Sequence, residues 1–345
     1  MPTSRLTVVA SVIRRACAAS LLITAFVFAA PVSAQQPIVM KMTGIAINDP
    51  AHEYMTRYKD KIEAATNGRI KAEVYPGAQL GGFPQMVQGA QLGTIEFFVA
   101  PPGFLRGMDP RVQINDAPGM FQDMEHGQKT LTDPRFRDKF LDLTTAKGVK
   151  GLMIWNVGPT SYASSSPLRK LDDFRGKKFR VLASKVEIES MARIGVTGVP
   201  LDFSEVAAAL QSKTLDGARS SVVVMAPMKF FSSAKYLTTV ADTMIPVGGY
   251  VSMAWMDKLP ADLRKIVIDT AKVDEDWVFR RSVDANVYMT KAWRDGGGEV
   301  LTLPPEDQAE FMRRVSAVAD EVYGKDPVLG EMYQLYKQVA QSHRK

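Results

Sequence analysis

Helical and strand-like patterns alternate along the first part of the chain, and this order limits the possible folds more than any other feature. Asp49 followed by Pro50 offers a helix N-cap and a suitable first helical residue. Apolar side chains then recur at helical spacing until Asn67-Gly68. The pattern predicts a helix from about residue 50, strands over 70–74, 95–99 and 151–155, and a short helix over 83–92. Strands that alternate with helices indicate an α/β fold.

A second constraint is the region between Pro260 and Gly296, which contains no proline or glycine and repeats apolar residues at helical spacing. A helix of this length would extend about 50 Å, so we expect it to brace two lobes. The glycines at 296–298 should end it, because a phosphate-binding loop needs its glycines after a strand and before a helix. The acidic run 274–276 lies within this helix and is expected to be solvated rather than a metal site.

The first 34 residues are typical of a secretory signal peptide. Three arginines precede or flank the start of fifteen uncharged residues, 16–30, and Val32-Ser33-Ala34 forms a small-residue cleavage motif. A membrane span needs roughly 20 apolar residues, so this stretch is too short to be one. We therefore expect an exported protein that begins near Gln35.

Cysteine and histidine usage excludes several kinds of chemistry. Cys17 is the only cysteine and lies within the expected signal peptide, where the arginines just before it disfavour a lipid anchor. The exported chain would have no disulfide, thiol nucleophile or cysteine metal cluster. His52, His126 and His343 are far apart, and none belongs to a catalytic or metal-binding motif, so we expect surface or helix-capping roles. We predict no cofactor and no metal site.

Length and charge limit the organisation and the partners. Removing 34 of 345 residues leaves 311, more than one hydrophobic core usually serves, so two lobes are expected. Three of the 43 Lys and Arg residues and none of the 37 acidic residues lie in the signal segment, so the net charge falls from +6 to +3. A weak charge spread along the chain argues against nucleic-acid binding.

The segment Arg175–Ser184 raises the main functional question. Its cationic and apolar residues alternate as in a strand, so Phe179 and Val181 would share one face while Arg180 lies on the other. An arginine beside other cations is usually solvated. A guanidinium can also be directed into a pocket, where its planar fork of donors fits a carboxylate. The local pattern leaves both interpretations open.

A series of motifs between Arg175 and Ser221 resembles the extracytoplasmic solute receptors of tripartite ATP-independent periplasmic (TRAP) transporters, the DctP-like family. These motifs are Gly176, Lys178 and Arg180 in a strand, Gly198 and Pro200 in a turn, Phe203–Val206 at a helix start, Ala209-Leu210-Gln211, and Asp216-Gly217. Tyr75-Pro76, Gln79-Leu80-Gly81 and Leu92-Gly93-Thr94 are similar to the family's first-lobe motif. The resemblance covers essentially the whole chain, including the long helix and the signal peptide.

The resemblance implies an α/β, two-lobe fold like that of periplasmic binding proteins, with a cleft between the lobes and a long C-terminal helix bracing both. Lobe I would comprise residues 35–157 and about 246–285, and lobe II about 158–245 and about 286–345. It also implies a monomeric periplasmic protein that binds a small carboxylate ligand and delivers it to TRAP membrane permease subunits.

The resemblance also assigns roles in the cleft. Arg180 would form a salt bridge with the ligand carboxylate. Phe203 would pack on the ligand, although a residue at this place could instead staple the start of its helix. Many family members carry a second arginine where this chain has Thr160, and an amide where it has Ser220. We therefore expect a second guanidinium and an amide to be missing.

The remaining positions suggest the type of ligand. Phe83 and Pro101 stand where polar residues often face polyol ligands in the family. A desolvated hydroxyl without a partner costs roughly 1–3 kcal/mol, so sugar acids should be disfavoured. The neutral groups left for hydrogen bonding are Asn156, Thr160, Tyr162 and Ser220. Together these features predict a small monocarboxylate with an apolar or aromatic body.

Two other functions fit the same sequence. One is a secreted enzyme that acts on carboxylated substrates with an Asp or Glu base, and recovery of the bound acid unchanged would oppose it. The other is a sensor module that presents the acid to a membrane receptor, and neighbouring permease genes would oppose it. The sequence has no recognisable nucleophile, base or phosphate loop, which favours a binding protein over an enzyme.

Overall fold

The computed structural model describes residues 36–182 and 184–345. The expected signal peptide, residues 1–34, lies outside this range, and so does Cys17. Within the described range, no helix combines the length and the apolar character needed to cross a membrane.

The described strands form one nine-stranded sheet. They are β1 (Ile38–Thr43), β2 (Ile70–Tyr75), β3 (Phe97–Ala100), β4 (Val149–Ser164), β5 (Lys178–Val181), β6 (Thr197–Pro200), β7 (Gly217–Ser220), β8 (Tyr236–Ser252) and β9 (Glu299–Leu301). Their order is β2-β1-β3-β8-β4-β7-β5-β6, with β9 beside β8. Parallel pairs lie at both ends, where β1 pairs with β2 and β3, and β5 pairs with β6 and β7. The prediction of an α/β fold is confirmed.

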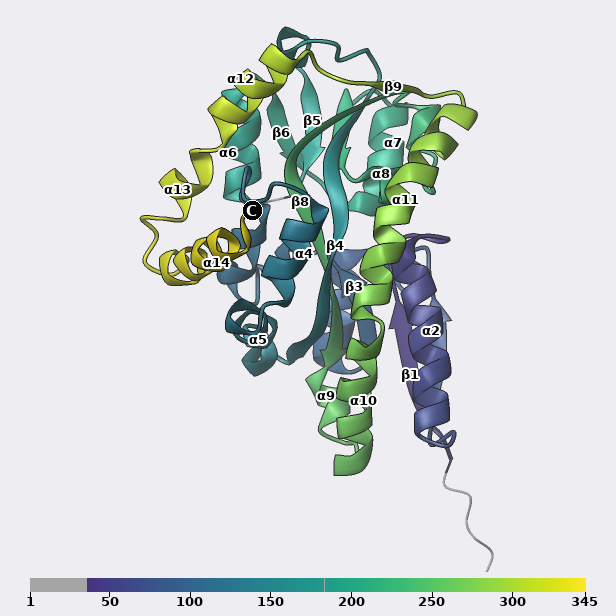
Figure 1. The fold of residues 1–345 in the computed structure, drawn as a ribbon. Coiled ribbons are helices and arrows are strands. Elements are labelled where there is room, and N and C mark those ends of the chain that lie inside the picture. Colours follow the sequence, from purple (N-terminus) through teal and green to yellow (C-terminus); the bar gives the residue numbers. More distant parts are fainter. Residues whose placement is uncertain (1–35, 183) are drawn as a thin grey trace, which may run out of the picture. The chain divides into compact units, whose positions relative to one another are not determined.

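The two long central strands join these parallel groups (Figure 1). β4 and β8 have 16 and 17 residues and are antiparallel to each other. β3 pairs with residues 248–251 of β8, whereas β7 pairs with residues 161–164 of β4. The β4–β8 register shifts three times between residues 151 and 161 of β4. Irregularities of this kind bend a strand, and here they lie where the two parallel groups meet.

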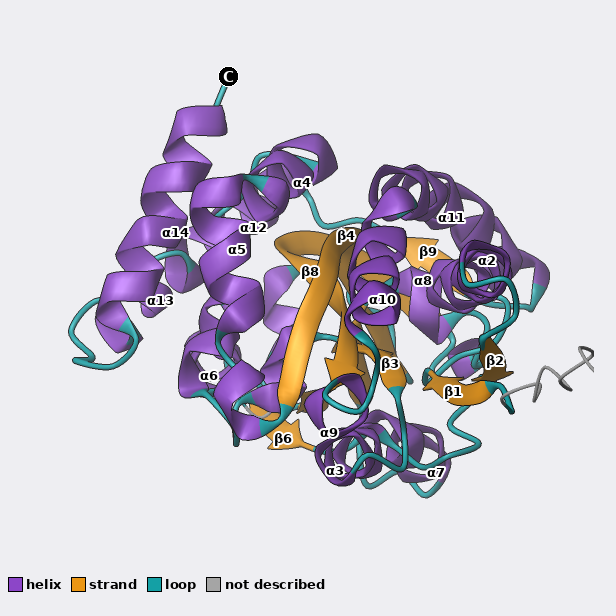
Figure 2. Ribbon diagram, turned by 90° about the horizontal axis from the view of Figure 1, so that it is seen from below, coloured by secondary structure: helices purple, strands orange, loops and turns teal. Residues whose placement is uncertain are grey.

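Helices cover the sheet around both groups of strands (Figures 1 and 2). They are α2 (Pro50–Ala65), α3 (Phe83–Leu92), α4 (Met124–Thr132), α5 (Pro134–Asp142), α6 (Lys185–Arg193), α7 (Val206–Gln211), α8 (Val222–Met225), α9 (Met253–Met256), α10 (Ala261–Val273), α11 (Glu275–Asp295), α12 (Pro305–Val315), α13 (Val318–Val322) and α14 (Gly330–His343). In Figure 1, α2, α9 and α10 surround the β1–β3 group, and α6, α7 and α12 surround the β5–β7 group. The helix α11 runs beside β4 and reaches both.

The long helix expected over 261–295 is divided in two, and this corrects the expectation. α10 ends at Val273 and α11 begins at Glu275, with Asp274 between them at φ −102° and ψ 16°. Asp274 is buried and accepts hydrogen bonds from Arg57 at 3.1 Å and Lys61 at 2.7 Å. These bonds fix the break against α2.

The acidic run is also less solvated than expected. Glu275 accepts hydrogen bonds from the backbone N–H of Ile154, at 2.8 Å, and from the guanidinium of Arg137, at 3.2 Å. Only Asp276 has a largely exposed side chain. The expectation of a solvated stretch was therefore wrong for Asp274 and Glu275, because α11 faces β4 and α2 at this point.

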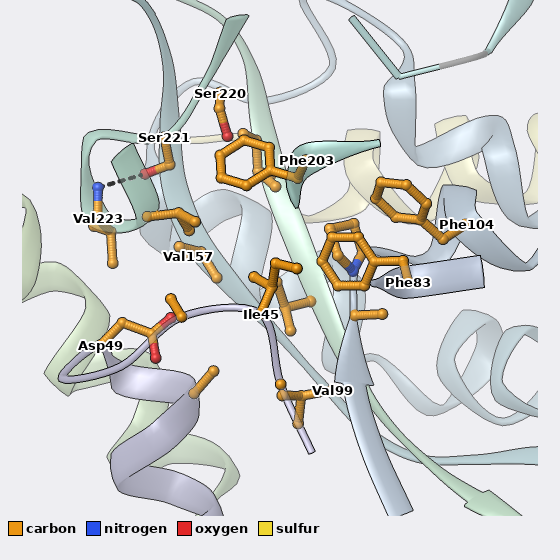
Figure 3. Close-up of a pocket in the computed structure, with 18 of the residues that line it drawn as sticks. Ile45, Asp49, Phe83, Val99, Phe104, Val157, Phe203, Ser220, Ser221 and Val223 are labelled. Carbon is orange, nitrogen blue, oxygen red and sulfur yellow. Dashed lines mark hydrogen bonds between the residues drawn. The ribbon is translucent and has the colours of Figure 1, made fainter. Parts of the chain in front are cut away.

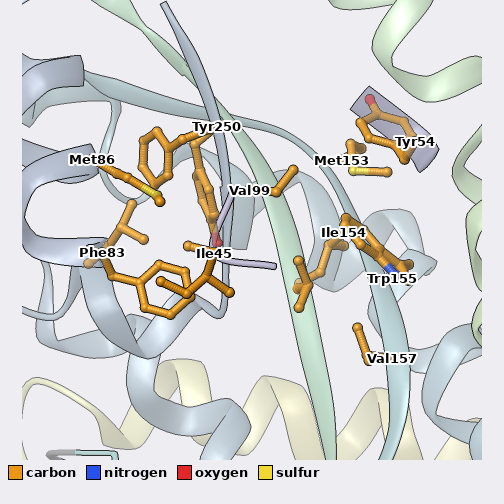
Figure 4. Packing of buried hydrophobic residues seen from close by; sticks show 14 of the residues in the cluster. Ile45, Tyr54, Phe83, Met86, Val99, Met153, Ile154, Trp155, Val157 and Tyr250 are labelled. Carbon is orange, nitrogen blue, oxygen red and sulfur yellow. The ribbon is translucent and has the colours of Figure 1, made fainter. Parts of the chain in front are cut away.

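The start of α2 and its packing follow from its sequence. Asp49 caps the helix, and Pro50 occupies the first turn, where its missing N–H is not needed. Tyr54 and Tyr58 are buried, and their hydroxyls donate to the carbonyls of Ala271, at 2.9 Å, and Val267, at 2.8 Å. These two bonds hold α2 against α10, with Tyr54 also beside Trp155 of β4 (Figure 4).

Several local predictions are confirmed and others need correction. The helices from residue 50 and over 83–92 and the strand over 70–74 form as expected, and α11 ends just before the glycines at 296–298. The strand expected over 95–99 begins instead at Phe97, and the one over 151–155 is a short part of β4. His126 is buried, not at the surface, and its Nε2 contacts the carbonyl oxygen of Ala340 at 2.8 Å. The expected capping role holds, because its Nδ1 accepts from the backbone N–H of Gln122 at 3.0 Å, just before α4.

Candidate ligand-binding site

A cavity of about 60 Å³ lies where the two parallel groups of strands meet. The β1–β3 side contributes the loop after β1, the start of α2, Phe83 of α3 and Pro101 after β3. The β5–β7 side contributes Arg180, Phe203 and Ser220, with part of α8. Figure 3 shows apolar side chains from both sides facing one space, with few polar groups among them. A cavity between two sheet groups is a common place for a small ligand.

Arg180 reaches this cavity from β5 because side chains alternate along a strand. Phe179 and Val181 are fully buried on the opposite face, in a separate apolar cluster with Phe174 and Phe311. Arg180 is itself only 2 % exposed. The sequence left two interpretations of Arg180 open, a solvated surface charge and a guanidinium directed into a pocket. Its burial excludes the solvated surface charge.

The guanidinium of Arg180 is only partly bonded. Its Nε donates to the carbonyl of Leu201 at 3.0 Å, and its Nη1 reaches the carbonyl of Arg219 at 3.5 Å. Its Nη2 is buried and has no hydrogen-bond partner among the described residues. Burial lowers the pKa of Arg180 to about 10, which still leaves it charged at neutral pH. A buried charged donor without a partner is costly, so the site favours an anion beside it.

A second guanidinium lines the cavity and is fully paired. Arg219 of β7 is 5 % exposed and forms salt bridges with Glu187 and, at 2.6 Å, with Asp242. It also donates to the hydroxyls of Thr243 and Tyr162, at 2.8 and 3.2 Å. Burial alone would lower the pKa of Arg219, but the two carboxylates raise it well above its ordinary value. Its positive charge is thus balanced within the protein.

Glu187 and one further carboxyl, that of Asp116, lie close to both arginines. Burial raises the pKa of Glu187, although Arg219 and Arg180 oppose this effect. Burial also raises the pKa of Asp116 to about 7, with a further contribution from the charge of Glu187. One oxygen of Asp116, Oδ2, is buried without a hydrogen-bond partner in the described range. Glu187 and Asp242 already pair with Arg219, so Asp116 is an additional acidic group in this region.

Aromatic rings form much of the apolar wall. The ring of Phe203 lies 4.9 Å from the guanidinium carbon of Arg180, a distance suited to a cation–π contact. Behind it, Phe203 stacks on Phe230 with ring centroids 5.3 Å apart. On the other side of the cavity, Phe83 packs on Phe104 with centroids 4.1 Å apart. These contacts fix the rings, so the wall is preformed for an apolar or planar group.

The structure brings together five of the eight residues that the sequence suggested for the site. The five that line the cavity are Arg180, Phe203, Ser220, Phe83 and Pro101. The other three, Asn156, Thr160 and Tyr162, are buried and bond to the protein instead. The hydroxyl of Thr160 donates to Asp242 at 2.6 Å, and that of Tyr162 donates to the same oxygen at 3.2 Å. The amide of Asn156 donates to the carbonyl of Met124 at 3.1 Å.

Sequence reasoning missed five polar residues of the cavity wall: Arg219, Glu187, Asp49, His52 and Ser221. The expectation that a second guanidinium would be missing is corrected, because Arg219 supplies one from a different strand. The available signal was the cation itself, which directly precedes Ser220, a residue already expected in the site. His52 and Asp49 are at the start of α2, and their use in capping gave no sign that they also face a cavity.

The wall holds His52 and the carboxylates of Asp49 and Glu187, which are residue types that can bind metal ions. In residues 36–182 and 184–345, no group of three or more His, Asp or Glu side chains is arranged to hold a metal ion. Of these wall residues, Glu187 pairs with Arg219, and Asp49 accepts from the backbone N–H of His52.

A family comparison matches most of the chain. Residues 43–326 match the model of the bacterial extracellular solute-binding proteins, family 7. A curated relative, the C4-dicarboxylate-binding periplasmic protein DctP of Rhodobacter capsulatus, is 29 % identical over 292 residues, which cover 83 % of this chain and 87 % of the relative.

Comparisons with solved structures give the same fold. The sugar acid binding protein DctPAm of Advenella mimigardefordensis, in complex with galactonate, has a TM-score of 0.84 and 22 % identity, and the match covers 89 % of this chain and 99 % of that one. A TRAP periplasmic solute-binding protein of Desulfovibrio salexigens, with bound orotic acid, has a TM-score of 0.83 and 26 % identity over the same shares of both chains. The two-lobe architecture expected from the sequence is confirmed at this level.

Proposed function

Because the chain belongs to family 7 of the bacterial extracellular solute-binding proteins, we propose that it captures a small organic acid in the cavity and holds the carboxylate with Arg180. The observation that carries this proposal is the buried Nη2 of Arg180, which has no hydrogen-bond partner among the described residues. A carboxylate beside Nη2 would form a charge-assisted hydrogen bond of about 2.7–2.9 Å. It would also pair directly with the guanidinium, on which the carboxylates of Glu187, Asp202 and Asp116 act only from a distance.

We propose a monocarboxylate with an apolar or aromatic body as the ligand. Only one of the two guanidiniums in the wall is available, since Glu187 and Asp242 already pair with Arg219. The rest of the wall is mostly apolar, with the ring of Phe83 contributed by the β1–β3 side and that of Phe203 by the β5–β7 side. Several hydroxyls would lack partners there, so a sugar acid is a poor fit. The orotic acid in the related TRAP protein, a carboxylated planar ring, is consistent with this class.

We further propose that the two lobes divide near residues 157 and 245 and close around the acid. The register shifts of β4 between residues 156 and 161 would absorb such a hinge motion. Binding would select the closed state, because only closure brings the β1–β3 side of the cavity onto a ligand held by Arg180. The protein would work in the periplasm as a monomer and deliver the acid unchanged to the permease subunits of a TRAP transporter.

A thermal-shift screen tests the proposed ligand class. The purified protein without its first 34 residues is mixed with benzoate, orotate, succinate or galactonate. We expect the aromatic monocarboxylates to raise the melting temperature by a few degrees at about 100 times their dissociation constant. Galactonate should have the smallest effect. Mass spectrometry of the denatured protein would then identify any acid that copurifies with it.

Two variants make this screen specific. Arg180→Met should abolish the shift, and Arg175→Met should preserve it, because the side chain of Arg175 is 70 % exposed and outside the cavity. An equal shift by the same acid in wild type and Arg180→Met would reject the role of Arg180. Conversion of the acid during incubation would favour the enzyme alternative.

A further inference from the structure

Another polar side chain, that of Asp49, lines the cavity on the side away from Phe203. Asp49, just before α2, is 5 % exposed, and its side chain points toward the cavity across from Phe83 and Phe203 (Figure 3). Its Oδ1 accepts a hydrogen bond from the backbone N–H of His52 at 2.9 Å. In the described part of the chain, no residue donates a hydrogen bond to the other oxygen, Oδ2. Half of this buried carboxylate is therefore free to bond something in the cavity.

The charge of Asp49 is also unbalanced. Burial raises its pKa to about 6, so it is mostly ionised at neutral pH. Among the described residues, no Lys or Arg forms an ion pair with it, whereas the nearby Glu53 pairs with Arg281 at 2.5 Å. The N-terminus of α2 stabilises the carboxylate only in part. A buried carboxylate without a cation is unusual, and it suggests that a donor from a ligand completes the site.

His52 adds a donor beside this acceptor. Its ring Nδ1 accepts a hydrogen bond from the backbone N–H of Asn48 at 3.1 Å. An accepting Nδ1 carries no proton, so the neutral ring has its proton on Nε2. His52 lines the same cavity, and Nε2 is its only ring nitrogen left for a ligand. The helix cap holds both residues in place, because Asp49 bonds to the backbone of His52 while the ring of His52 bonds to the backbone of Asn48.

We infer that Asp49 and His52 bind a hydroxyl at the end of the ligand that is remote from its carboxylate, an inference that rests on the proposed function. A hydroxyl both donates and accepts. It would donate to Oδ2 of Asp49 and accept from Nε2–H of His52. An ammonium group cannot accept from His52. A second carboxylate has no proton to donate and is repelled by Asp49. An amide needs two separate atoms to donate and accept, so a hydroxyl is the smallest group that satisfies both residues. The ligand class is thus a monocarboxylate with an apolar middle and one distal hydroxyl.

Isothermal titration calorimetry at pH 8 tests this inference with matched acids. One series is the unbranched acids of three to six carbons, each with and without a terminal hydroxyl. The other is benzoate substituted at its 3- or 4-position with hydroxyl, aminomethyl, carboxamide or carboxylate. We expect at least one hydroxylated acid to bind about tenfold or more tightly than its parent, as a hydrogen bond to a charged group gives. The matching dicarboxylate should bind more weakly than the parent.

Three variants separate recognition from folding. Asp49→Asn keeps a good N-cap. It should reduce the hydroxyl preference to about threefold or less, and it should improve binding of the dicarboxylate about tenfold, because the repulsion is removed. His52→Leu should reduce the hydroxyl preference without helping the dicarboxylate. Asp60→Asn, on an exposed position of the same helix, should change neither.

The possible failures are distinguishable. If hydroxylated and unsubstituted acids bind equally and Arg180→Met abolishes both, the inference is overturned and the proposed function stands. If an aminomethyl, carboxamide or dicarboxylate acid binds most tightly to the wild type, the assignment of a hydroxyl is overturned. If no acid binds the wild type, the proposed function and this inference are overturned together.

Discussion

Two buried arginines line the same cavity, and they differ in what surrounds their charge. Arg219 is held by two carboxylates and two hydroxyls, whereas Arg180 has one good hydrogen bond, to a backbone carbonyl, and its Nη2 has no partner among residues 36–182 and 184–345. Their pKa values move in opposite directions: burial lowers that of Arg180 to about 10, and the paired carboxylates raise that of Arg219. The two arginines are buried to a similar extent, but the charge of Arg219 is neutralised within the protein, whereas that of Arg180 is available to a ligand.

This difference assigns Arg219 to the stability of the fold and Arg180 to ligand binding. A saturated buried ion network is expensive to break, because each partner that remains is left charged in an apolar region. An unsaturated guanidinium contributes little to the unliganded fold and is preorganised for an anion. If this distinction is correct, equivalent substitutions at the two arginines must have opposite consequences.

The largest effect is expected for Arg219→Met. This change leaves Glu187 and Asp242 buried without their cation, and such a loss typically costs about 3–5 kcal/mol in the free energy of unfolding. Urea unfolding followed by circular dichroism would measure it. Arg193→Met is the matched control, because Arg193 forms an exposed pair with Glu321 and should lose no more than about 1 kcal/mol. If Arg219→Met lost as little free energy of unfolding as Arg193→Met, the structural role of Arg219 would be wrong.

A smaller effect on stability is expected for Arg180→Met. Removing a desolvated charge that lacks a full set of partners should change the free energy of unfolding by less than about 1 kcal/mol, or raise it. The same variant should bind the acid at least about thirtyfold more weakly, as expected when one partner of a buried charge pair is lost. Unfolding and calorimetry on one preparation would measure both. A large loss of stability with unchanged affinity would reverse the roles of the two arginines.

An effect that depends on pH is expected at Asp116, which lies near both arginines and forms no salt bridge with the described residues. Burial raises its pKa from 3.8 to about 7. A raised pKa in the folded state means that its contribution to stability is present below pH 3.8 and is lost as the pH rises through about 7. Wild type should therefore lose more stability than Asp116→Asn between pH 5 and pH 8. Melting curves of both proteins at these pH values would test this, and parallel losses would contradict it.

The sequence predicts the position of Arg180 better than its surroundings. Alternation along β5 places Phe179 and Val181 in the core and Arg180 on the opposite face, and this depends only on local geometry. The partners of Arg219 could not be read locally. Glu187, 32 residues away, and Asp242, 23 residues away, meet it only after β5, β7 and β8 enter one sheet.

The dependence on contacts between distant parts of the chain also explains why some predicted site residues lie outside the cavity. Thr160 and Tyr162 were expected in the cavity, but both hydroxyls bond to Asp242 behind it. In β4 their side chains follow the β7 and β8 pairing, which includes the register shift between Pro159 and Ser161. A shift of one residue changes which face a side chain occupies, and sequence periodicity does not reveal it. The break at Asp274 likewise depends on cations that α2 supplies.

The most direct test of the account is a crystal structure of the protein with the tightest acid from the binding series. We predict a ligand carboxylate oxygen at about 2.7–2.9 Å from Nη2 of Arg180, with Arg219 still bonded to Glu187 and Asp242. A structure in which the carboxylate binds Arg219, or leaves Nη2 of Arg180 without an anion, would contradict the central claim.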